Sequence, residues 1–119
     1  MSMMPVEHLG VAAIGDEELV SGLRLAGVSK YYMIKGNRDV REDVRGALTE
    51  LIAVPDIGVV VILEKYAEYV EDLITQVRES KRMTPIIIEV PSKLGTEHPD
   101  IVGYYKTFVR EAIGFDIEI

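Results

Sequence analysis

The chain has 119 residues, a formal net charge of −7 and no cysteine. Its length suits one domain with a single core. The acidic charge disfavours nucleic acid and anionic membranes as partners. The lack of cysteine excludes disulfides, thiolate metal sites and cysteine nucleophiles. The first residues show no signal-peptide pattern, and no apolar run approaches the roughly 20 residues of a membrane helix. We therefore expect no direct insertion into a membrane.

The first half of the chain alternates between short apolar runs and segments with helical spacing. Residues 9–14 are an apolar run that ends before Gly15 and predicts a buried strand. Residues 17–26 carry apolar side chains at helical spacing, and residues 28–34 are β-branched and aromatic, as in a second strand. Asp39 followed by Glu42 matches a capping box, which predicts the start of a second helix.

The second half continues the same alternation. Residues 58–63 are apolar at every position after the glycine, which is typical of a central parallel strand covered on both faces. Residues 66–77 show helical spacing and predict a third helix, with Tyr66 and Tyr69 on its apolar side. Residues 85–90 predict a fourth strand, and Pro91 closes it.

This order predicts an α/β fold: a doubly wound, four-stranded parallel sheet of Rossmann-like or receiver-like type, over residues 1–91. Residues 92–119 are predicted as a loop and an additional C-terminal amphipathic helix. Pro99 suits the first turn of that helix, and apolar residues follow it as a broad stripe. The helix can either cap the sheet or dock on another molecule.

The turn after the first predicted strand does not suit a nucleotide. A dinucleotide site needs several glycines there, but Gly15 is followed by Asp16, Glu17 and Glu18, whose carboxylates would repel phosphates. We interpret Asp16 as a helix cap, with the glutamates favouring the positive helix end. A receiver domain would use Asp16 and Glu17 as its acidic pair. However, Glu64 stands where a receiver has its phosphoacceptor aspartate. A degenerate receiver-like signalling domain is therefore the alternative hypothesis.

Other chemistry has weaker support in the sequence. His8 and His98 have no companion at metal-ligand spacing, and no serine sits in a nucleophile elbow. A third hypothesis is a module that binds nucleotides or nucleic acid. It would depend on a local basic patch near Tyr31 and Tyr32, formed by Lys35, Arg38, Arg41 and Arg45. Acidic residues interrupt this patch, as is usual on a solvated, ion-paired helix face. We predict no catalytic residue, no metal site and no cofactor.

Three segments resemble a known family, the F subunits of the archaeal and vacuolar-type (A/V-type) ATP synthases and ATPases. They are "IGDEELVSGLRLAGV" at 14–28, "VPDIGVVVILEKYAEYV" at 54–70 and "TPIIIEVPSK" at 84–93. The resemblance implies a non-catalytic rotor subunit of the central stalk, which binds the coiled-coil axle, the D subunit. It also implies that the C-terminal helix is mobile, reaches the catalytic A and non-catalytic B subunits, and modulates ATP hydrolysis. Such a protein lies peripherally at the cytoplasmic face of the membrane, in a complex that couples ATP to proton or other ion transport.

Docking on an axle needs apolar anchors ringed by polar groups. We place the axle contacts first in the C-terminal segment, second at the corner after the fourth strand, and third at two basic residues. One of these two, Arg24, is expected to point away from the apolar stripe of its helix. The simpler interpretation of the C-terminal residues is that they cover the sheet. In this order, the candidate residues are Tyr104, Tyr105, Phe108, Val109 and Ile113, then Pro91, Ser92 and Lys93, then Arg24 and Lys30.

Overall fold

The protein folds around one parallel sheet whose strands lie in the order β2-β1-β3-β4. The computed structural model describes residues 10–25, 27–36, 39–81 and 85–91, together with residues 103 and 107. The sheet confirms the predicted α/β doubly wound fold. In chain order, the elements are β1 (Gly10–Gly15), α1 (Glu17–Leu25), β2 (Lys30–Met33), α2 (Val40–Ala53), β3 (Ile57–Leu63), α3 (Glu64–Ala67), the 3-10 helix η2 (Glu68–Val70), α4 (Glu71–Glu79) and β4 (Ile86–Val90).

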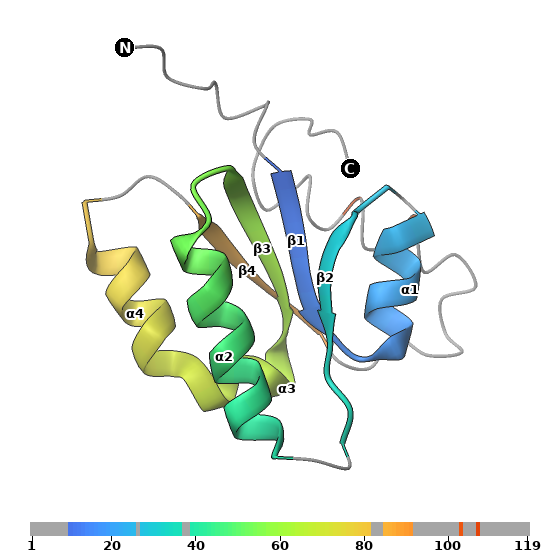
Figure 1. Ribbon diagram of the computed structural model, residues 1–119, viewed down its shortest axis with the longest axis horizontal. Helices are drawn as coiled ribbons and strands as arrows, with labels where there is room; N and C mark the ends of the chain where they lie inside the picture. The colour runs from blue at the N-terminus through green and yellow to red at the C-terminus, as the bar shows by residue number, and fades with distance from the viewer. Residues whose placement is uncertain are drawn as a thin grey trace.

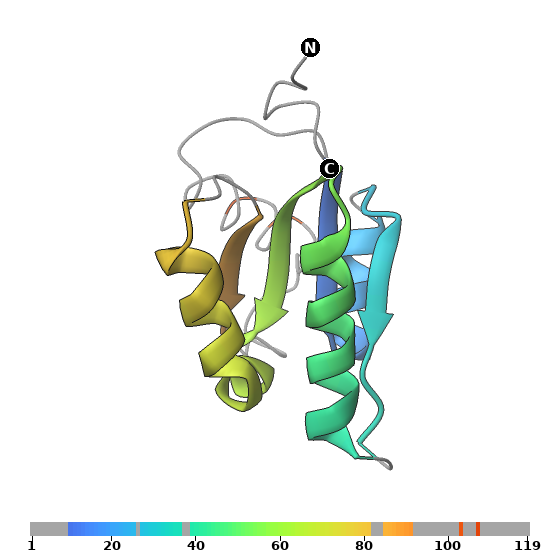
Figure 2. The ribbon, with the colours of Figure 1, turned by 60° about the vertical axis from the view of Figure 1, so that its left-hand side comes forward.

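Helices lie on both faces of the sheet. α1 covers one face beside β1 and β2, whereas α2 and α4 lie next to each other on the opposite face (Figures 1 and 2). This division follows from the strand order. The chain moves from β1 outward to β2, crosses back over β1 to β3, and then moves outward again to β4. Right-handed crossovers in opposite directions place their helices on opposite faces.

The two central strands form the middle of the hydrophobic core. All seven residues of β3 are buried, and in β1 only Gly10 is exposed. Such continuous burial is what a parallel strand covered on both faces requires. Leu19, Leu23, Leu48 and Leu51 bring α1 and α2 onto the sheet. Within the described ranges, no polar or charged residue is buried.

Side-chain caps begin two of the helices, as predicted. The N–H of Leu19 donates to Oδ1 of Asp16 at 3.0 Å, and the N–H of Glu42 donates to Oδ1 of Asp39 at 3.2 Å. Each aspartate thus satisfies a backbone donor that the first helical turn leaves without a partner. After α1, Gly27 has a φ of 111°, a left-handed conformation that glycine adopts without strain.

The predicted third helix lies at the expected place in the chain, but it is not one continuous helix. It is divided into α3, η2 and α4, and the chain bends at Val70, whose φ is −131° and ψ is 28°. Tyr66 and Val70 are buried as the spacing predicts. Tyr69 is instead 38% exposed, and the guanidinium carbon of Arg41 lies 5.6 Å from the centre of its ring.

The predicted C-terminal helix lies almost wholly outside the described residues. Gly103 and Thr107 are described, and both are helical, which fits the prediction for the segment after Pro99. The described part of the chain contains no helix with the length and apolar character needed to cross a membrane.

Candidate partner-binding site

The carboxyl ends of β1 and β3 form the place where doubly wound folds usually bind their ligands. The chain leaves these two adjacent strands in opposite directions, which opens a crevice at that edge of the sheet. Asp16 follows β1, and Glu64 and Lys65 follow β3. Asp16 already caps α1, and its Oδ2 lies 3.7 Å from Nζ of Lys65. The Asp16 carboxylate at the crevice is therefore already paired with Lys65.

A buried tyrosine lies beside this ion pair. Tyr66 is 7% exposed, and Nζ of Lys65 lies 5.3 Å from the centre of its ring. Burial raises the pKa of the Tyr66 phenol, and the carboxylate of Asp16 raises it further. A carboxylate, a neutral phenol and an already paired lysine do not make a phosphate cradle, which needs open N–H groups and free positive charge.

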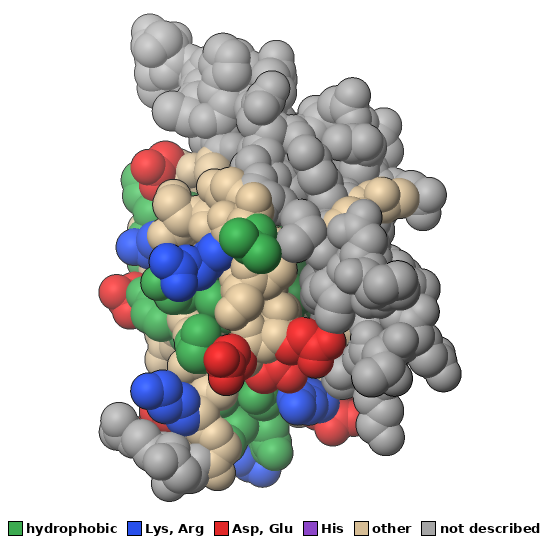
Figure 3. Space-filling view, turned by 90° about the vertical axis from the view of Figure 1, so that its right-hand side faces the viewer, with side chains coloured by type: hydrophobic (Ala, Val, Ile, Leu, Met, Phe, Trp, Pro, Cys, Tyr) green, Lys and Arg blue, Asp and Glu red, His purple; other side chains and the backbone are tan. Residues whose placement is uncertain are grey.

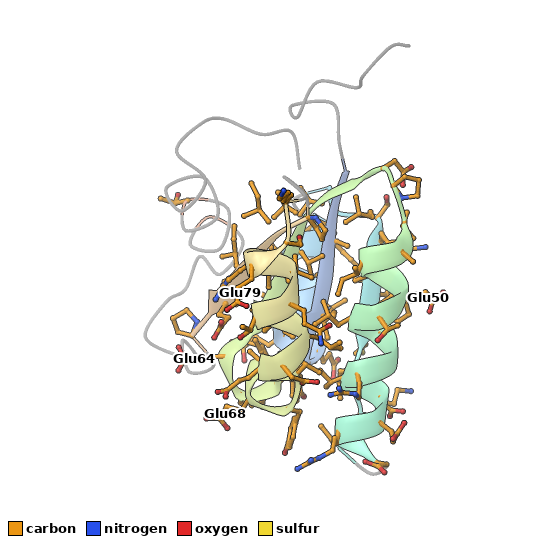
Figure 4. All side chains as sticks on the ribbon, turned by 90° about the vertical axis from the view of Figure 1, so that its left-hand side faces the viewer. Glu50, Glu64, Glu68 and Glu79 are labelled. Carbon is orange, nitrogen blue, oxygen red and sulfur yellow. The ribbon has the colours of Figure 1, made fainter. Side chains whose placement is uncertain are left out.

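The glutamates near this region do not converge on a common point. Figure 4 labels Glu50, Glu64, Glu68 and Glu79, which project from α2, α3, η2 and α4 respectively. All four are exposed and lie on the outside of the molecule. The described residues contain no group of three or more His, Cys, Asp or Glu side chains that could hold a metal ion.

The basic residues of α2 have partners within the fold. The Arg45 guanidinium binds both carboxylate oxygens of Asp72 on α4, with Nη1 donating to Oδ1 at 3.1 Å. This pairing lowers the pKa of the Asp72 carboxyl and raises the pKa of Arg45. Arg41 lies over Tyr69. These contacts support the interpretation of this helix face as solvated and internally paired.

A shallow hollow lies between α2 and α4, with a volume of about 270 Å³. Aliphatic and uncharged polar side chains line it, and the lining carries no charged group: Thr49, Ile52, Leu73, Gln76, Val77 and Ser80. It lacks the converging polar groups that orient a small-molecule ligand.

The outer side of β2 carries a different kind of surface. The guanidinium carbon of Arg24 lies 4.9 Å from the centre of the Tyr31 ring, so the end of α1 is tied to the edge strand by a cation–π contact. Leu25, the last residue of α1, is 81% exposed, and Lys30 and Lys35 are also exposed. We call these five residues, Arg24, Leu25, Lys30, Tyr31 and Lys35, the β2-edge patch. Figure 3 shows basic and hydrophobic side chains side by side on this face of the molecule, with acidic side chains around them.

The structure brings together some of the predicted contact residues and separates others. Arg24 stacks on Tyr31, and Lys30 begins the same edge strand. Pro91 is half-buried and follows β4, which is the edge strand across the sheet from β2. Pro91 therefore lies at the carboxyl ends of the strands, whereas Lys30 lies at the amino end of β2. The remaining predicted residues lie outside the described ranges: Ser92, Lys93, Tyr104, Tyr105, Phe108, Val109 and Ile113.

Sequence reasoning missed Leu25 and Tyr31. A signal for Leu25 was present, because the buried positions of α1 are Leu19, Val20, Gly22 and Leu23, and Leu25 falls outside their helical spacing. Tyr31 was noted only beside the basic patch, and its place at a sheet edge could not be predicted, since strand order decides which strand lies at an edge.

Together, these features define a small doubly wound domain whose usual ligand crevice holds an internal ion pair and whose exposed surface includes an edge strand. Residues 11–108 match the family model described as ATP synthase (F/14-kDa) subunit. The chain therefore belongs to this family of ATP synthase F subunits.

Individual relatives agree with this assignment. The F subunit of the A-type ATP synthase of Pyrococcus abyssi is 33% identical over 108 residues, which cover 91% of this chain and 97% of the relative. Its counterpart in Thermococcus sibiricus is 35% identical over 108 residues, with the same coverage. That of Methanococcus aeolicus is 31% identical over 111 residues, covering 91% of this chain and 98% of the relative.

Proposed function

We propose that this chain is a non-catalytic rotor component in the central stalk of an A-type ATP synthase, where it binds the coiled-coil axle, the D subunit. The observation that carries the proposal is the family match over residues 11–108, which spans most of the chain. The complex would be peripheral at the cytoplasmic face of the membrane and would couple ATP synthesis or hydrolysis to ion transport.

The geometry supports a role in binding rather than in catalysis. At the carboxyl end of β1, Asp16 is used as a helix cap and as the partner of Lys65. Tyr66 beside them is held neutral by burial, which raises its pKa. In contrast, the β2-edge patch combines an exposed leucine, an exposed aromatic ring and an arginine with lysines around them, which suits apolar and aromatic anchors inside a polar rim.

The proposal is tested by mixing the chain with the axle protein of the same source and measuring the mass of the mixture by size-exclusion chromatography with light scattering. We expect a stable one-to-one complex. If the two proteins elute separately at micromolar concentration and low salt, the proposed partner is wrong.

The regulatory half of the proposal concerns residues 92–119. We propose that this segment reaches the A and B subunits and modulates ATP hydrolysis. Assembled complexes that contain the chain truncated at Gly95 would then hydrolyse ATP at a different rate from complexes with the full chain. An unchanged rate, with the truncated chain retained in the complex, would remove the regulatory role and leave axle binding intact.

The receiver-like hypothesis has one observation in its favour. Asp16 and Glu64 follow the adjacent strands β1 and β3, as the acidic groups of a receiver do. It predicts that Glu64→Ala abolishes binding to an output domain or to a second copy. The rotor proposal predicts that Glu64→Ala leaves binding to the axle unchanged, because Glu64 lies outside the β2-edge patch.

A further inference from the structure

The two edge strands of the sheet, β4 and β2, differ in what covers their outward backbone among the described residues. At β4, Arg78 from α4 donates from Nη2 to the carbonyl oxygen of Ile87 at 3.0 Å, and it lies 3.6 Å from Oε2 of Glu89. A long charged side chain thus covers the backbone of this edge strand. At β2, no described strand lies on the side away from β1.

The backbone groups that β2 leaves unpaired can be assigned from its register. Tyr32 lies opposite Ile14, and the N–H of Ile34 donates to the carbonyl oxygen of Gly15 at 2.8 Å. Ile34 therefore turns its backbone towards β1. Because successive residues of a strand turn their backbone groups to opposite sides, Tyr31 and Met33 turn theirs away from β1. Within the described part of the chain, no strand pairs with those groups.

The side chains along this edge define what such a strand should contain. Lys30 and Lys35 are exposed, and Arg24 stacks on Tyr31, so three basic side chains lie along this edge strand of a protein whose net charge is −7, with the Glu50 carboxylate near Tyr32 of the same strand. A second copy of this chain would bring a second set of basic groups to the same edge, which is electrostatically unfavourable. An acidic strand would instead complement them, with Leu25 and Tyr31 as apolar contacts.

We infer that β2 is a docking edge at which an extended, acidic segment of the axle protein adds as a fifth strand, held by the backbone of Tyr31 and Met33 and by the charges of the β2-edge patch. Strand addition of this kind derives its affinity from backbone hydrogen bonds and its specificity from alternate side chains. The inference depends on the proposed function, because it names the axle as the source of the strand.

Amide hydrogen exchange tests the inference directly on the wild-type chain. Exchange at Tyr31 and Met33 is measured in the free chain and in the complex with the axle protein. We expect both amides to slow by about tenfold or more in the complex, as new hydrogen bonds require. If the complex forms and these amides exchange as fast as in the free chain, the inference is wrong while the proposed function stands. If no complex forms, both fail.

A matched pair of substitutions separates the backbone from the side chain. Tyr31→Ala removes the ring and its contact with Arg24 but keeps the N–H, whereas Tyr31→Pro also removes the N–H. Proline is tolerated at an outward position of an edge strand. We expect Tyr31→Pro to bind the axle about fivefold more weakly than Tyr31→Ala, the effect of one lost hydrogen bond. Equal affinities of the two folded variants would contradict strand addition. If Tyr31→Pro does not fold, hydrogen exchange on the wild type decides.

The charge of the partner segment is tested by reversing the lysines. The double variant Lys30→Glu with Lys35→Glu should weaken axle binding by about tenfold or more at low salt, and the loss should shrink as salt screens the charges. Lys81→Glu is a control for charge reversal elsewhere, because Lys81 is exposed just after α4, and α4 lies on the far side of the molecule from β2 (Figure 1). If the double variant and the control bind alike, the lysines serve only to prevent self-association of the edge. Protection by another component of the complex or by a second copy, without the axle, would refute the axle as the occupant.

Discussion

A methyl group on Gly15 would lie 2.5 Å from Cδ2 of Leu19, which is fully buried in the first turn of α1. Among the described residues the positive φ lies at Gly27, so Gly15 is required by close packing and not by its backbone conformation. The turn from β1 into α1 is thus a packing contact between the helix and the sheet.

This contact makes Gly15→Ala a destabilising substitution. The added methyl must displace Leu19 from the core or shift α1, and overpacking of this kind costs about 1–3 kcal/mol. Urea unfolding followed by circular dichroism would show a lower midpoint with an unchanged slope. A variant as stable as the wild type would mean that Leu19 moves aside at no cost.

Gly46→Ala is the matched control for that experiment. Gly46 lies within α2, is exposed, and has nothing within 4 Å of the position that a Cβ would take. Alanine is favoured over glycine inside a helix, so this variant should gain about 0.5–1 kcal/mol in the free energy of unfolding. The opposite signs of the two changes would show that the cost at Gly15 is steric.

The sequence predicted those parts of the fold that depend on local patterns. The two aspartate caps were foreseen because a carboxylate followed by an apolar-periodic segment has a direct local use. β3 was foreseen because only a strand covered on both faces carries such a continuous apolar run. Both arguments need nothing beyond the residues next to them in the chain.

The break at Val70 could not be foreseen in the same way. Tyr66, Val70 and Ile74 are spaced four apart and are all buried, so the apolar pattern stays in phase through α3, η2 and α4. No proline or glycine marks the bend. The periodicity that indicated one helix is therefore equally compatible with three short pieces that present the same face to the sheet.

The site was predicted only in part, for a related reason. Arg24 was expected to point away from the apolar stripe, and it is exposed. Its stacking on Tyr31 depends on α1 lying over β2, and the exposure of β2 depends on the strand order. Both are tertiary relationships between segments, which local patterns do not specify.

Two substitutions of Asp16 separate its cap from its ion pair. Asp16→Asn keeps a side-chain oxygen for the N–H of Leu19 but removes the charge that faces Lys65, whereas Asp16→Ala removes both. Because the ion pair is partly exposed and weak, we expect Asp16→Asn to be nearly neutral. Asp16→Ala should lower the free energy of unfolding by about 1 kcal/mol, the usual value of a cap. Urea unfolding of the two variants beside the wild type measures both effects.

The same two variants also bear on function. If the crevice between β1 and β3 is not the binding site, Asp16→Asn should bind the axle protein as tightly as the wild type, measured by calorimetry. Strong loss of axle binding by Asp16→Asn would instead place part of the axle contact at this crevice.

The pair between Arg45 and Asp72 gives a stability that depends on pH. Arg45 lowers the pKa of Asp72 below its ordinary value of 3.8, so the folded protein holds the ionised carboxylate more strongly than the unfolded chain does. The stabilisation is fully present above that ordinary value and is lost as the pH falls through the lowered pKa. Thermal unfolding of the wild type and of Asp72→Asn should therefore differ at neutral pH and converge in acid.

The double variant Arg45→Gln with Asp72→Asn completes this test as a thermodynamic cycle. Both side chains are exposed at the surface, so the coupling between them should be small and should decrease further in high salt. A difference between wild type and Asp72→Asn that persists in strong acid would show that Asp72 acts through something other than its charge.

Arg78 should protect the β4 edge from pairing with other chains. Arg78→Ala removes the hydrogen bond to the Ile87 carbonyl and the charge beside Glu89, which should cost about 1 kcal/mol and expose edge backbone. We expect more high-mass species than for the wild type when both are measured by light scattering at the same concentration. Arg78→Lys keeps a charge at the edge but cannot reproduce the guanidinium geometry, so it should fall between the two. If Arg78→Ala has the same mass distribution as the wild type, the arginine stabilises the contact of α4 with β4 but does not shield the edge. The difference in edge covering between β4 and β2 would then have no effect on self-association.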